Sequence, residues 1–375
     1  MLNESHILPT PYYYYDLDQV VDNINAYKEI TDNCVRILYA TMANARPEIL
    51  RSVKKAEIGV FVNSISHLTL ARQAGINPND IVFAGSGHET ELIEFLSGAG
   101  VHYHADSIHQ LEHYIKCKPN GRAGLRVNVG SLLGDFEIDP APRLGMNTDE
   151  IESAIRQFKG NAITLHVYVG TNLLNAEMHK KCLTALYTLA KEYECVSDID
   201  LGGGFAFAPG DDNDRGVWLE VIELWQKLHK EKPGLKLTIE PGRSIVRNAG
   251  RFFVKVTDIK KRNGKTFVMV NSSGTWFPRK IVHGYDEEFV TVSGNESKDG
   301  LLDTYICGSS TFSKDFLTKS RLPNMSIDDV ICFNAAGAYN EAMHLDFLGM
   351  PKPGIVVKEH GEIKIVRETE RPKVC

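Results

Sequence analysis

Short runs of apolar and β-branched residues recur between amphipathic helical patterns over the first two-thirds of the chain. We count eight runs, at residues 35–41, 58–63, 81–84, 101–105, 125–129, 163–169, 199–201 and 237–239. Continuously apolar strands separated by helices are typical of a parallel sheet that is covered on both faces. Eight such units in roughly 210 residues match the size of a closed (β/α)8 barrel. The number of strands favours this barrel over an open, doubly wound sheet.

Beyond residue 249 the pattern changes to strands with no long helix between them. Residues 252–259, 266–270 and 289–292 alternate or run as strands, and Asn263-Gly264 is a typical two-residue hairpin turn. The next helical pattern begins at Glu341. The pattern predicts a mostly antiparallel β-domain, to which the run Tyr12–Tyr15 adds a strand. We therefore expect a barrel over residues 30–245 and a β-domain built from residues 1–29 plus 246–375.

Composition and charge narrow the classes of partner. The chain has 375 residues, 43% of them hydrophobic and 24% charged, and its formal net charge is −6. This composition is typical of a soluble globular protein. Because no basic block or basic–aromatic interleave is present, the sequence argues against nucleic acid and anionic membranes as partners. We expect a small-molecule ligand.

Targeting signals and cysteine spacing point to the cytoplasm. The longest apolar runs are too short to cross a bilayer, and the N-terminus lacks the basic region and apolar core of a signal peptide. The seven cysteines are scattered and never form a Cys-x-x-Cys pair. This spacing argues against a disulfide framework and a structural zinc site, so no metal is expected and a reducing compartment is favoured.

Two glycine-containing turns follow the last two expected barrel strands. One contains Gly202, Gly203 and Gly204, and the other is Glu240-Pro241-Gly242-Arg243. Consecutive glycines let backbone N–H groups approach an anion closely, and Arg243 adds a positive charge. Because barrels often bind phosphate after strands 7 and 8, the turns predict a phosphate or carboxylate site. A tight structural turn is the alternative interpretation of the triple glycine.

Several segments resemble one enzyme family when they are taken together. Three are similar to phosphate-binding signatures: IDLGGGF (199–205), IEPGRSIV (239–246) and GAY (337–339). Further matches are PYYYYDLD (11–18), LYATMANARPEIL (38–50), LRVN (125–128) and RLGM (143–146). The chain resembles the fold-type III pyridoxal-phosphate-dependent decarboxylases, which include ornithine, arginine and diaminopimelate decarboxylases. HLDFLGMPKP (344–353) is similar to the siderophore-pathway branch of this family.

The resemblance implies a fold, a cofactor and a role for each matching residue. It implies the barrel and β-domain described above and a two-fold homodimer with active sites shared between subunits. Tyr168 would stack on the ring of pyridoxal phosphate, and Glu240 would meet the protonated pyridine nitrogen. The cofactor phosphate would be held by Gly202, Gly203, Gly204, Gly242 and Arg243, with a hydroxyl donated by Tyr339.

The chain departs from the family at the positions of its catalytic residues. Met42 stands in Tyr39-Ala40-Thr41-Met42-Ala43-Asn44 at the position of the lysine that holds the cofactor covalently. A thioether has no amine, so it can neither form that link nor act as a base. Phe61 and His67 replace two carboxylic residues of the family, and Tyr168 replaces a ring-stacking histidine. In CGSSTFSKD, Thr311 takes the place of the partner-subunit cysteine, while Asp315 is retained in the loop expected to contact substrate.

These departures leave several interpretations open. The leading one is a relative of amino-acid decarboxylases that binds pyridoxal phosphate, or its adduct with an amino acid, without a covalent link. Its ancestral reaction would be α-decarboxylation of an amino acid or an amino-acid-derived, siderophore-like intermediate. The alternatives are a non-catalytic ligand-binding subunit, a repurposed enzyme for another phosphorylated ligand, and an engineered lysine-to-methionine trap. Several coordinated departures favour natural divergence over a single engineered change.

Other nucleophile patterns are missing from the sequence. No HExxH, GxSxG, Walker A or dinucleotide motif is present, so a hydrolase or nucleotide-dependent enzyme has no support. His104 and His166 lie near expected strand ends, and His344 lies in the C-terminal third. Isolated histidines are usually structural, and we interpret these three in that way.

Overall fold

A computed structural model of the chain describes residues 7–31, 35–118, 121–158, 162–284, 286, 290–292 and 301–371. The chain divides into two compact units, one of residues 21–245 and one of residues 1–20 together with 246–375. The first boundary falls inside helix α1 (Leu17–Thr31), because this helix follows the first strand without a break.

The unit 21–245 is a closed barrel of eight parallel strands, as the sequence pattern predicts. The closure is made by β2, which pairs with both β3 and β9. The strands are β2 (Val35–Ala40), β3 (Gly59–Val62), β4 (Ile81–Ala84), β5 (His102–Ala105), β6 (Arg122–Arg126), β7 (Ala162–His166), β8 (Val196–Asp200) and β9 (Lys236–Ile239). Most of their residues are buried on both faces, which explains their continuous apolar character.

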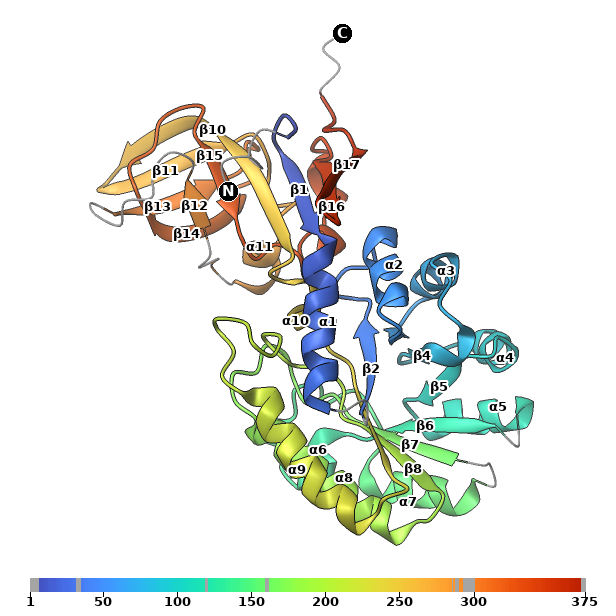
Figure 1. Cartoon of the computed structure of the whole chain (residues 1–375). Helices are drawn as coiled ribbons and strands as arrows, with labels where there is room; N and C mark the ends of the chain where they lie inside the picture. The colour runs from blue at the N-terminus through green and yellow to red at the C-terminus, as the bar shows by residue number, and fades with distance from the viewer. Residues whose placement is uncertain are drawn as a thin grey trace. The chain divides into compact units, whose positions relative to one another are not determined.

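Helices follow the barrel strands in turn (Figure 1). They are α2 (Pro47–Lys55), α3 (Ile65–Gln73), α4 (Thr90–Gly98), α5 (Ile108–Cys117), α6 (Val129–Leu133), α7 (Thr148–Gln157), α8 (Glu177–Glu192), α9 (Val217–Glu231) and α10 (Arg243–Val246). Two 3₁₀ turns, η1 (Pro78–Asp80) and η2 (Phe136–Ile138), lie between them. Serine caps fix two helix starts, since Ser64 accepts from the N–H of His67 and Ser107 accepts from the N–H of Gln110.

The other unit contains a nine-stranded, mostly antiparallel sheet. Its main path runs β14-β13-β11-β10-β1-β16-β17, and β15 joins β12 to β10. The strands are β1 (Tyr12–Asp16), β10 (Gly250–Arg262), β11 (Lys265–Val270), β12 (Val290–Val292), β13 (Leu302–Cys307), β14 (Phe316–Leu322), β15 (Val330–Phe333), β16 (Gly354–Glu359) and β17 (Glu362–Arg367). The short helices are α11 (Arg279–His283), η3 (Glu341–Met343) and η4 (Asp346–Leu348).

The tyrosine run forms a central strand of this sheet, which confirms its predicted role. Strand β1 is antiparallel to β10 and parallel to β16. Its side chains are buried on both faces, and Tyr13 stacks on Phe252 with ring centroids 4.3 Å apart. Asn263 and Gly264 both have positive φ and join β10 to β11, as expected of a hairpin turn.

Two elements differ from the sequence expectation, and a third lies partly outside the described residues. Strand β6 ends at Arg126, and Val129 already begins α6, so the predicted strand 125–129 is displaced. The helical pattern at Glu341 gives only the 3₁₀ turns η3 and η4. The predicted strand 289–292 is present from Val290, while Phe289 lies outside the described residues.

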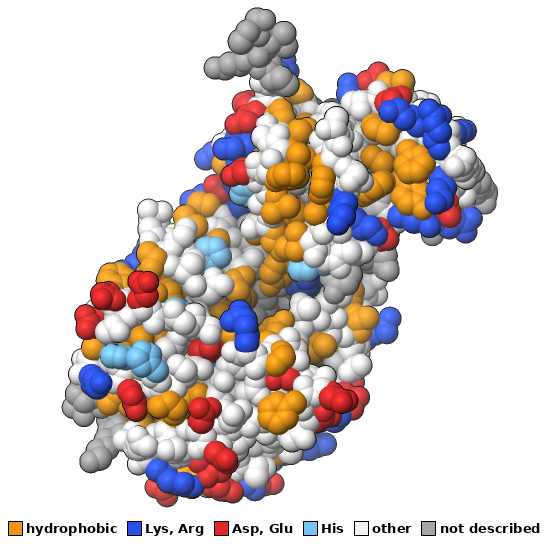
Figure 2. All heavy atoms as spheres, turned by 180° about the vertical axis from the view of Figure 1, so that it is seen from behind, with side chains coloured by type: hydrophobic (Ala, Val, Ile, Leu, Met, Phe, Trp, Pro, Cys, Tyr) orange, Lys and Arg blue, Asp and Glu red, His pale blue; other side chains and the backbone are white. Residues whose placement is uncertain are grey.

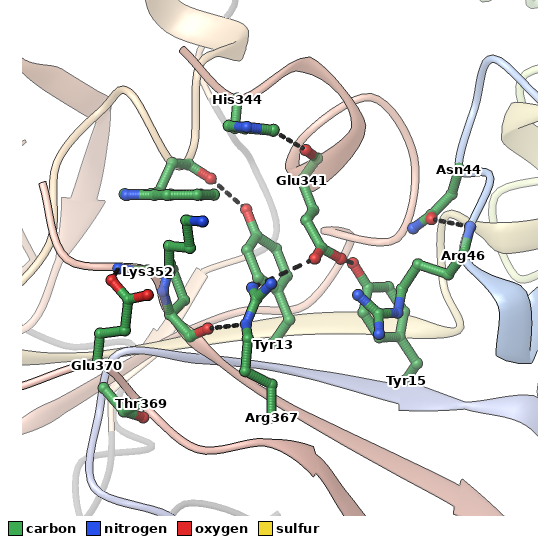
Figure 3. A network of polar contacts seen from close by, with 12 residues as sticks. Tyr13, Tyr15, Asn44, Arg46, Glu341, His344, Lys352, Arg367, Thr369 and Glu370 are labelled. Carbon is green, nitrogen blue, oxygen red and sulfur yellow. Dashed lines mark hydrogen bonds and ion pairs between the residues drawn. The ribbon is translucent and has the colours of Figure 1, made fainter. Parts of the chain in front are cut away.

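A polar network ties the ends of the chain together in the second unit (Figure 3). Tyr15 donates a hydrogen bond of 2.8 Å to Oε2 of Glu341, and Nη2 of Arg367 lies 3.5 Å from Oε1 of the same carboxylate. Tyr13 donates to the carbonyl oxygen of Trp276. These contacts fix β1 against distant segments of the chain, since the Tyr13–Trp276 bond spans 263 residues and the Tyr15–Glu341 bond spans 326.

Surface charge, helix hydropathy and the cysteines can be compared with the sequence expectations. On the face drawn in Figure 2, Lys and Arg side chains are interspersed with Asp and Glu over the barrel unit, without a continuous basic field. Within the described ranges, no helix is both long and apolar enough to cross a membrane. Cys117, Cys182, Cys195 and Cys307 are free. Cys34, Cys375 and residues 1–6, on which the disulfide and signal-peptide expectations partly rest, lie outside the described residues.

Candidate functional site

The loop after β8 requires glycine at consecutive positions. Gly202 and Gly204 have φ of 67° and 94°, a region that side-chain-bearing residues rarely adopt. A Cβ on Gly203 would lie 2.6 Å from the carbonyl oxygen of Glu240. In the part of the chain that the structure describes, no protein acceptor is bonded to the backbone N–H of Gly203 or Gly204. The loop therefore offers two adjacent donors to an anion.

A neighbouring side chain holds the glycine loop from the other side. The His179 Nε2–H donates to the carbonyl oxygen of Gly203 at 2.9 Å, and the His179 ring stacks on Phe205. Burial lowers the pKa of His179 to about 4, so the ring is neutral at physiological pH. The carbonyl of Gly204 accepts from Leu173 at 2.8 Å. The carbonyls of the loop are thus engaged by the barrel and its N–H groups point elsewhere.

The turn after β9 lies against the segment that carries Met42. The amide of Glu240 donates to the carbonyl of Gly202 at 2.7 Å, which joins the two turns. A Cβ on Gly242 would meet the Cβ of Ala40 at 3.0 Å and that of Ala43 at 3.2 Å. The absence of a side chain at Gly242 thus lets the segment after β2 pack closely. Arg243, which is half-buried, begins α10 immediately afterwards.

Polar side chains at the ends of three barrel strands form a buried cluster. One potential ligand atom each of His104, Asp200 and Glu240 lies within 4.8 Å of the other two. We call these three residues the carboxylate–imidazole cluster. The Nε2 of His166 lies 3.5 Å from Oε1 of Glu240, next to the cluster. Asp200 is held by its Oδ1, which accepts from the N–H of Gly202 at 3.0 Å.

Burial controls the protonation of this cluster. It raises the pKa of Glu240 to about 8, and burial followed by repulsion from Glu240 raises the pKa of Asp200 well above its usual range. Burial lowers the pKa of His166 to about 4 and that of His104 well below its usual range. Both imidazoles are therefore neutral at pH 7, and the contact between His166 and Glu240 is not an ion pair.

Arg126 lies between Asp106 and Tyr168, and its positive charge opposes the rise in the pKa of Glu240. Its Nε lies 3.8 Å from Oδ1 of Asp106, and its guanidinium carbon lies 6.0 Å from the centre of the Tyr168 ring. This is within the range of a cation–π contact. Asp106 also accepts from the N–H of Gly145 at 3.0 Å, so the carboxylate is fixed from two sides. Tyr168 is half-buried at the end of the strand region that contains His166.

The position of Met42 is apolar. Met42 packs against a buried cluster formed by Leu38, Phe61, Val82 and Ala84, at the ends of β2, β3 and β4. We call this set the apolar cluster. Two positions that carry charged residues in the resembling family, those of Met42 and Phe61, therefore lie in one hydrophobic environment. An amine placed there would lose hydration without gaining a carboxylate partner from Phe61.

His67 bonds to the residue before Met42. The hydroxyl of Thr41 donates to the carbonyl of Phe61 at 3.0 Å and lies 2.9 Å from Nδ1 of His67. Because the hydroxyl has one proton, Nδ1 of His67 is the donor in the second contact. The imidazole thus supports the Met42 segment from α3, at a position where the family has a glutamate.

Two expected site residues belong to the second unit and are described there by themselves. Tyr339 is half-buried with a φ of 55°, and the buried Asn340 donates to the carbonyls of Ala336 and Ala338. Thr311 is exposed in the loop after β13. The phosphate contact of Tyr339 and the partner-subunit role of Thr311 remain predictions.

Both carboxylate oxygens of Asp315 already accept hydrogen bonds within the second unit. Its Oδ1 accepts from the hydroxyl of Ser273 at 2.9 Å and from the N–H of Gly274 at 2.6 Å. Its Oδ2 accepts from the N–H of Ser310 at 3.1 Å and from the hydroxyl of the same residue. The carboxylate is buried and braces the loop that contains Thr311. The predicted substrate contact of Asp315 is untested, and it would require some of these bonds to open.

Two barrel histidines are less isolated than the sequence pattern indicates. His104 and His166 were interpreted as isolated structural residues, yet His104 joins the carboxylate–imidazole cluster and His166 contacts it. Asp200, Asp106 and Arg126 were not singled out for any role. The available signal was their position, because each stands at or next to the C-terminal end of a barrel strand, where barrel active sites lie. His344, by contrast, stacks on Trp276 in the second unit.

The residues of the barrel can be tested against the cofactor implied by the resemblance. The glycine loop fits a phosphate, since side chains at Gly202, Gly203 or Gly204 would meet backbone oxygens at 2.4–2.9 Å. Glu240 is buried, and its Oε1 has no hydrogen-bond partner among the described residues, which suits a ring N–H donor. The non-covalent contacts therefore fit. Covalent attachment does not fit, because Met42 offers no amine.

Comparison with known proteins places these features in a family. Residues 17–247 match the model of the pyridoxal-dependent decarboxylase, pyridoxal binding domain. The diaminopimelate decarboxylase of Aquifex aeolicus is 24% identical over 383 residues, which cover 96% of this chain and 89% of that protein. The L-glutamyl-acyl-carrier-protein decarboxylase of Niallia circulans is 26% identical over 389 residues, covering 96% of this chain and 91% of that protein.

Solved structures show the same fold. Diaminopimelate decarboxylase from Helicobacter pylori, complexed with L-lysine, has a TM-score of 0.85 at 23% identity, with 99% of this chain and 96% of that chain covered. The arginine decarboxylase of Paramecium bursaria Chlorella virus has a TM-score of 0.83 at 20% identity, with 95% of this chain and 98% of that chain covered.

Proposed function

The chain belongs to the pyridoxal-dependent decarboxylase family, and from this premise we propose that its barrel binds pyridoxal phosphate, or an adduct of it with an amino acid, without a covalent link. When bound, this cofactor supplies an electron sink for the electron pair left by departing CO2. The residues of this chain bind and orient it. Gly202, Gly203, Gly204, Gly242 and Arg243 would hold the phosphate, Glu240 the ring nitrogen, and Tyr168 one face of the ring.

One observation supports altered or lost catalysis: Met42 packs against the apolar cluster that contains Phe61. A single engineered change at residue 42 would leave a carboxylate at position 61. Instead, both positions are apolar and belong to the same packed set. This concerted change supports natural divergence away from covalent cofactor binding, and it does not support an engineered trap.

The substrate class follows from the family only in outline. The relatives are named for diaminopimelate, arginine and a glutamyl group on an acyl-carrier protein, all of which contain an amino-acid carboxylate. The proposed ligand is therefore an amino acid or an amino-acid-derived, siderophore-like intermediate. A non-catalytic ligand-binding subunit is the second candidate, and the absence of the family's lysine, carboxylate and cysteine at Met42, Phe61 and Thr311 favours it over an enzyme with full turnover.

The binding mode is tested by absorbance with and without borohydride. The purified chain is mixed with pyridoxal phosphate, dialysed, and analysed by intact mass after borohydride treatment. The proposal expects saturable absorbance changes that disappear on dialysis and no added mass. A borohydride-fixed mass on another lysine would overturn the non-covalent mode, and the absence of saturable binding would overturn the cofactor itself.

We also propose a two-fold homodimer, on the basis of the resemblance to the same family. A two-fold homodimer would allow the loop around Thr311 and Asp315 to serve a neighbouring subunit. Sedimentation velocity at micromolar concentration should show a dimer, and a chain that sediments only as a monomer would contradict shared active sites.

A further inference from the structure

The carboxylate–imidazole cluster has the composition of a metal site. His104, Asp200 and Glu240 come from the ends of β5, β8 and β9, and their side chains converge inside the barrel. Their exposed fractions are only 3%, 0% and 6%. Imidazole and carboxylate groups together are the ligands that zinc and other divalent first-row metals prefer.

The cluster also has unused ligand atoms. Among the described residues, Nδ1 of His104, Oδ2 of Asp200 and Oε1 of Glu240 have no hydrogen-bond partner. Two buried carboxylates this close cannot both stay ionised unless a proton or a cation lies between them. Arg126 does not fill this role alone, because its nearest carboxylate is that of Asp106, 3.8 Å away. The two carboxyl groups therefore need a shared proton or a cation between them, and a bound metal ion would replace that proton.

The backbone is shaped to admit the His104 ring. Strand β6 carries Gly124 beside His104 in register, and a Cβ on Gly124 would lie 1.9 Å from Cδ2 of that ring. No larger residue at position 124 would leave the ring in place. Asp200 is likewise fixed through its Oδ1 by the N–H of Gly202, and its Oδ2 has no hydrogen-bond partner among the described residues.

The geometry points to a binding site for one divalent transition-metal ion, with His104, Asp200 and Glu240 as its ligands. Two ligands at about 2.05 Å from a tetrahedral metal are about 3.3 Å apart, and the ligand atoms of the cluster lie within 4.8 Å of one another, so metal binding would draw them closer together. His166, with Nε2 at 3.5 Å from Oε1 of Glu240, stands beside this site. Three protein ligands leave a fourth position for water.

This inference goes beyond the proposed cofactor and makes a distinct claim about the same barrel. Glu240 is common to both ligands, and a metal ion there would repel a protonated pyridine nitrogen. Metal and pyridoxal phosphate should therefore compete. Pyridoxal phosphate binding is measured in the presence of a chelator, so that failure of the cofactor proposal and failure of the metal proposal are separate results.

The test uses the full chain and Zn²⁺, with Co²⁺ as a spectroscopic probe. The exposed helix α5 carries His109 and half-buried His113 one turn apart, with ring centroids 4.5 Å apart, and this pair also attracts metals. All measurements are therefore made in a His109→Gln, His113→Gln background. Calorimetry should give one Zn²⁺ per chain, and Co²⁺ should show the visible bands of a low-coordinate nitrogen–oxygen site.

Ligand variants decide the assignment. His104→Gln and Asp200→Asn should each weaken Zn²⁺ binding by more than the roughly 10–100-fold that loss of an outer partner costs. Asp198→Asn is the matched control, since Asp198 is buried on the same strand but accepts from Thr238 outside the cluster. It should retain binding. Circular dichroism confirms that each variant is folded.

Three outcomes would overturn the assignment. The first is no bound metal once His109 and His113 are removed, which would leave a shared proton as the occupant of the cluster. The second is equal affinity in Asp200→Asn and Asp198→Asn. The third is Zn²⁺ binding that pyridoxal phosphate leaves unchanged while the cofactor itself binds.

Discussion

Gly203 lies so close to Glu240 that a Cβ on the glycine would be 2.6 Å from the carbonyl oxygen of the glutamate. The contact joins the turn after β8 to the turn after β9, and the N–H of Glu240 completes it by bonding to the carbonyl of Gly202 at 2.7 Å. The proposed phosphate donors of one turn and the proposed ring-nitrogen acceptor of the other are thus held together.

Replacing Gly203 with alanine should therefore disrupt ligand binding first. The new methyl group forces the two turns apart and displaces the N–H groups of Gly203 and Gly204. We expect the affinity for pyridoxal phosphate to fall by at least about tenfold, measured by absorbance titration. Gly234→Ala is the control, since a Cβ there meets nothing within 4 Å. Equal affinities in the two variants would remove the glycine loop from the site.

Acid should destabilise the barrel through His179. In the unfolded chain this histidine takes up a proton below about pH 6.5, whereas in the folded barrel its pKa is about 4 because of burial. The unfolded state therefore binds more protons between these values, and stability falls as the pH drops through this window. The contribution of His179 is up to about 3 kcal/mol.

The variant His179→Gln isolates this contribution from the other buried histidines. Glutamine can still donate to the carbonyl of Gly203 but does not titrate. Urea unfolding of both proteins from pH 7.5 to pH 4.5 should show a shallower loss of stability in the variant. Parallel pH profiles would show that His179 is not the group responsible.

The fold was predictable because strands that are buried on both faces have continuously apolar sequences. Barrel strands such as Ile81–Ala84 are continuously apolar, and the tyrosine run reads as a strand because each side chain is buried. The end of β6 was misplaced because Arg122, Gly124 and Arg126 interrupt its apolar pattern, while Val127 and Val129 continue it beyond the strand.

The cluster in the barrel was harder to predict because it depends on register. His166 pairs with Asp200 across β7 and β8, and His104 pairs with Gly124 across β5 and β6. A single polar residue at a strand end looks the same in sequence whether its neighbours are apolar or charged. The convergence of these side chains appears only when eight strands close into a barrel with fixed stagger.

The second unit should depend on the hydrogen bond between Tyr15 and Glu341 (Figure 3). Tyr15→Phe removes a 2.8 Å bond to a carboxylate whose side chain is only 12% exposed. Losing a hydrogen bond to a charged group costs about 1.5–3 kcal/mol. Urea unfolding of the full chain measures this loss. Tyr193→Phe is the matched control, because its 3.3 Å bond to Glu152 lies nearer the surface and should contribute less than about 1 kcal/mol.

Met42→Lys tests the central proposal most directly. The variant returns an amine to the position that packs against Phe61, while the glycine loop and Glu240 are unchanged. If the cofactor binds as proposed, borohydride treatment should now add its mass to Lys at position 42 in the intact protein. Met42→Leu, which is apolar and has no amine, is the control and should remain unmodified.

Activity of the same variant separates divergence from engineering. Phe61, Tyr168 and Thr311 remain unlike the residues of the family after Met42→Lys, and each missing acid–base group costs about 10²–10⁴ in rate. Several such losses together predict negligible release of CO2 from lysine, arginine, ornithine or diaminopimelate, even with the cofactor covalently attached. Because Phe61 leaves the new amine without a carboxylate partner in an apolar environment, the attachment should also be strongest at high pH, where the amine is neutral. Rapid decarboxylation by this single variant would show that Met42 alone prevents catalysis, and it would contradict a concerted natural divergence at Met42 and Phe61.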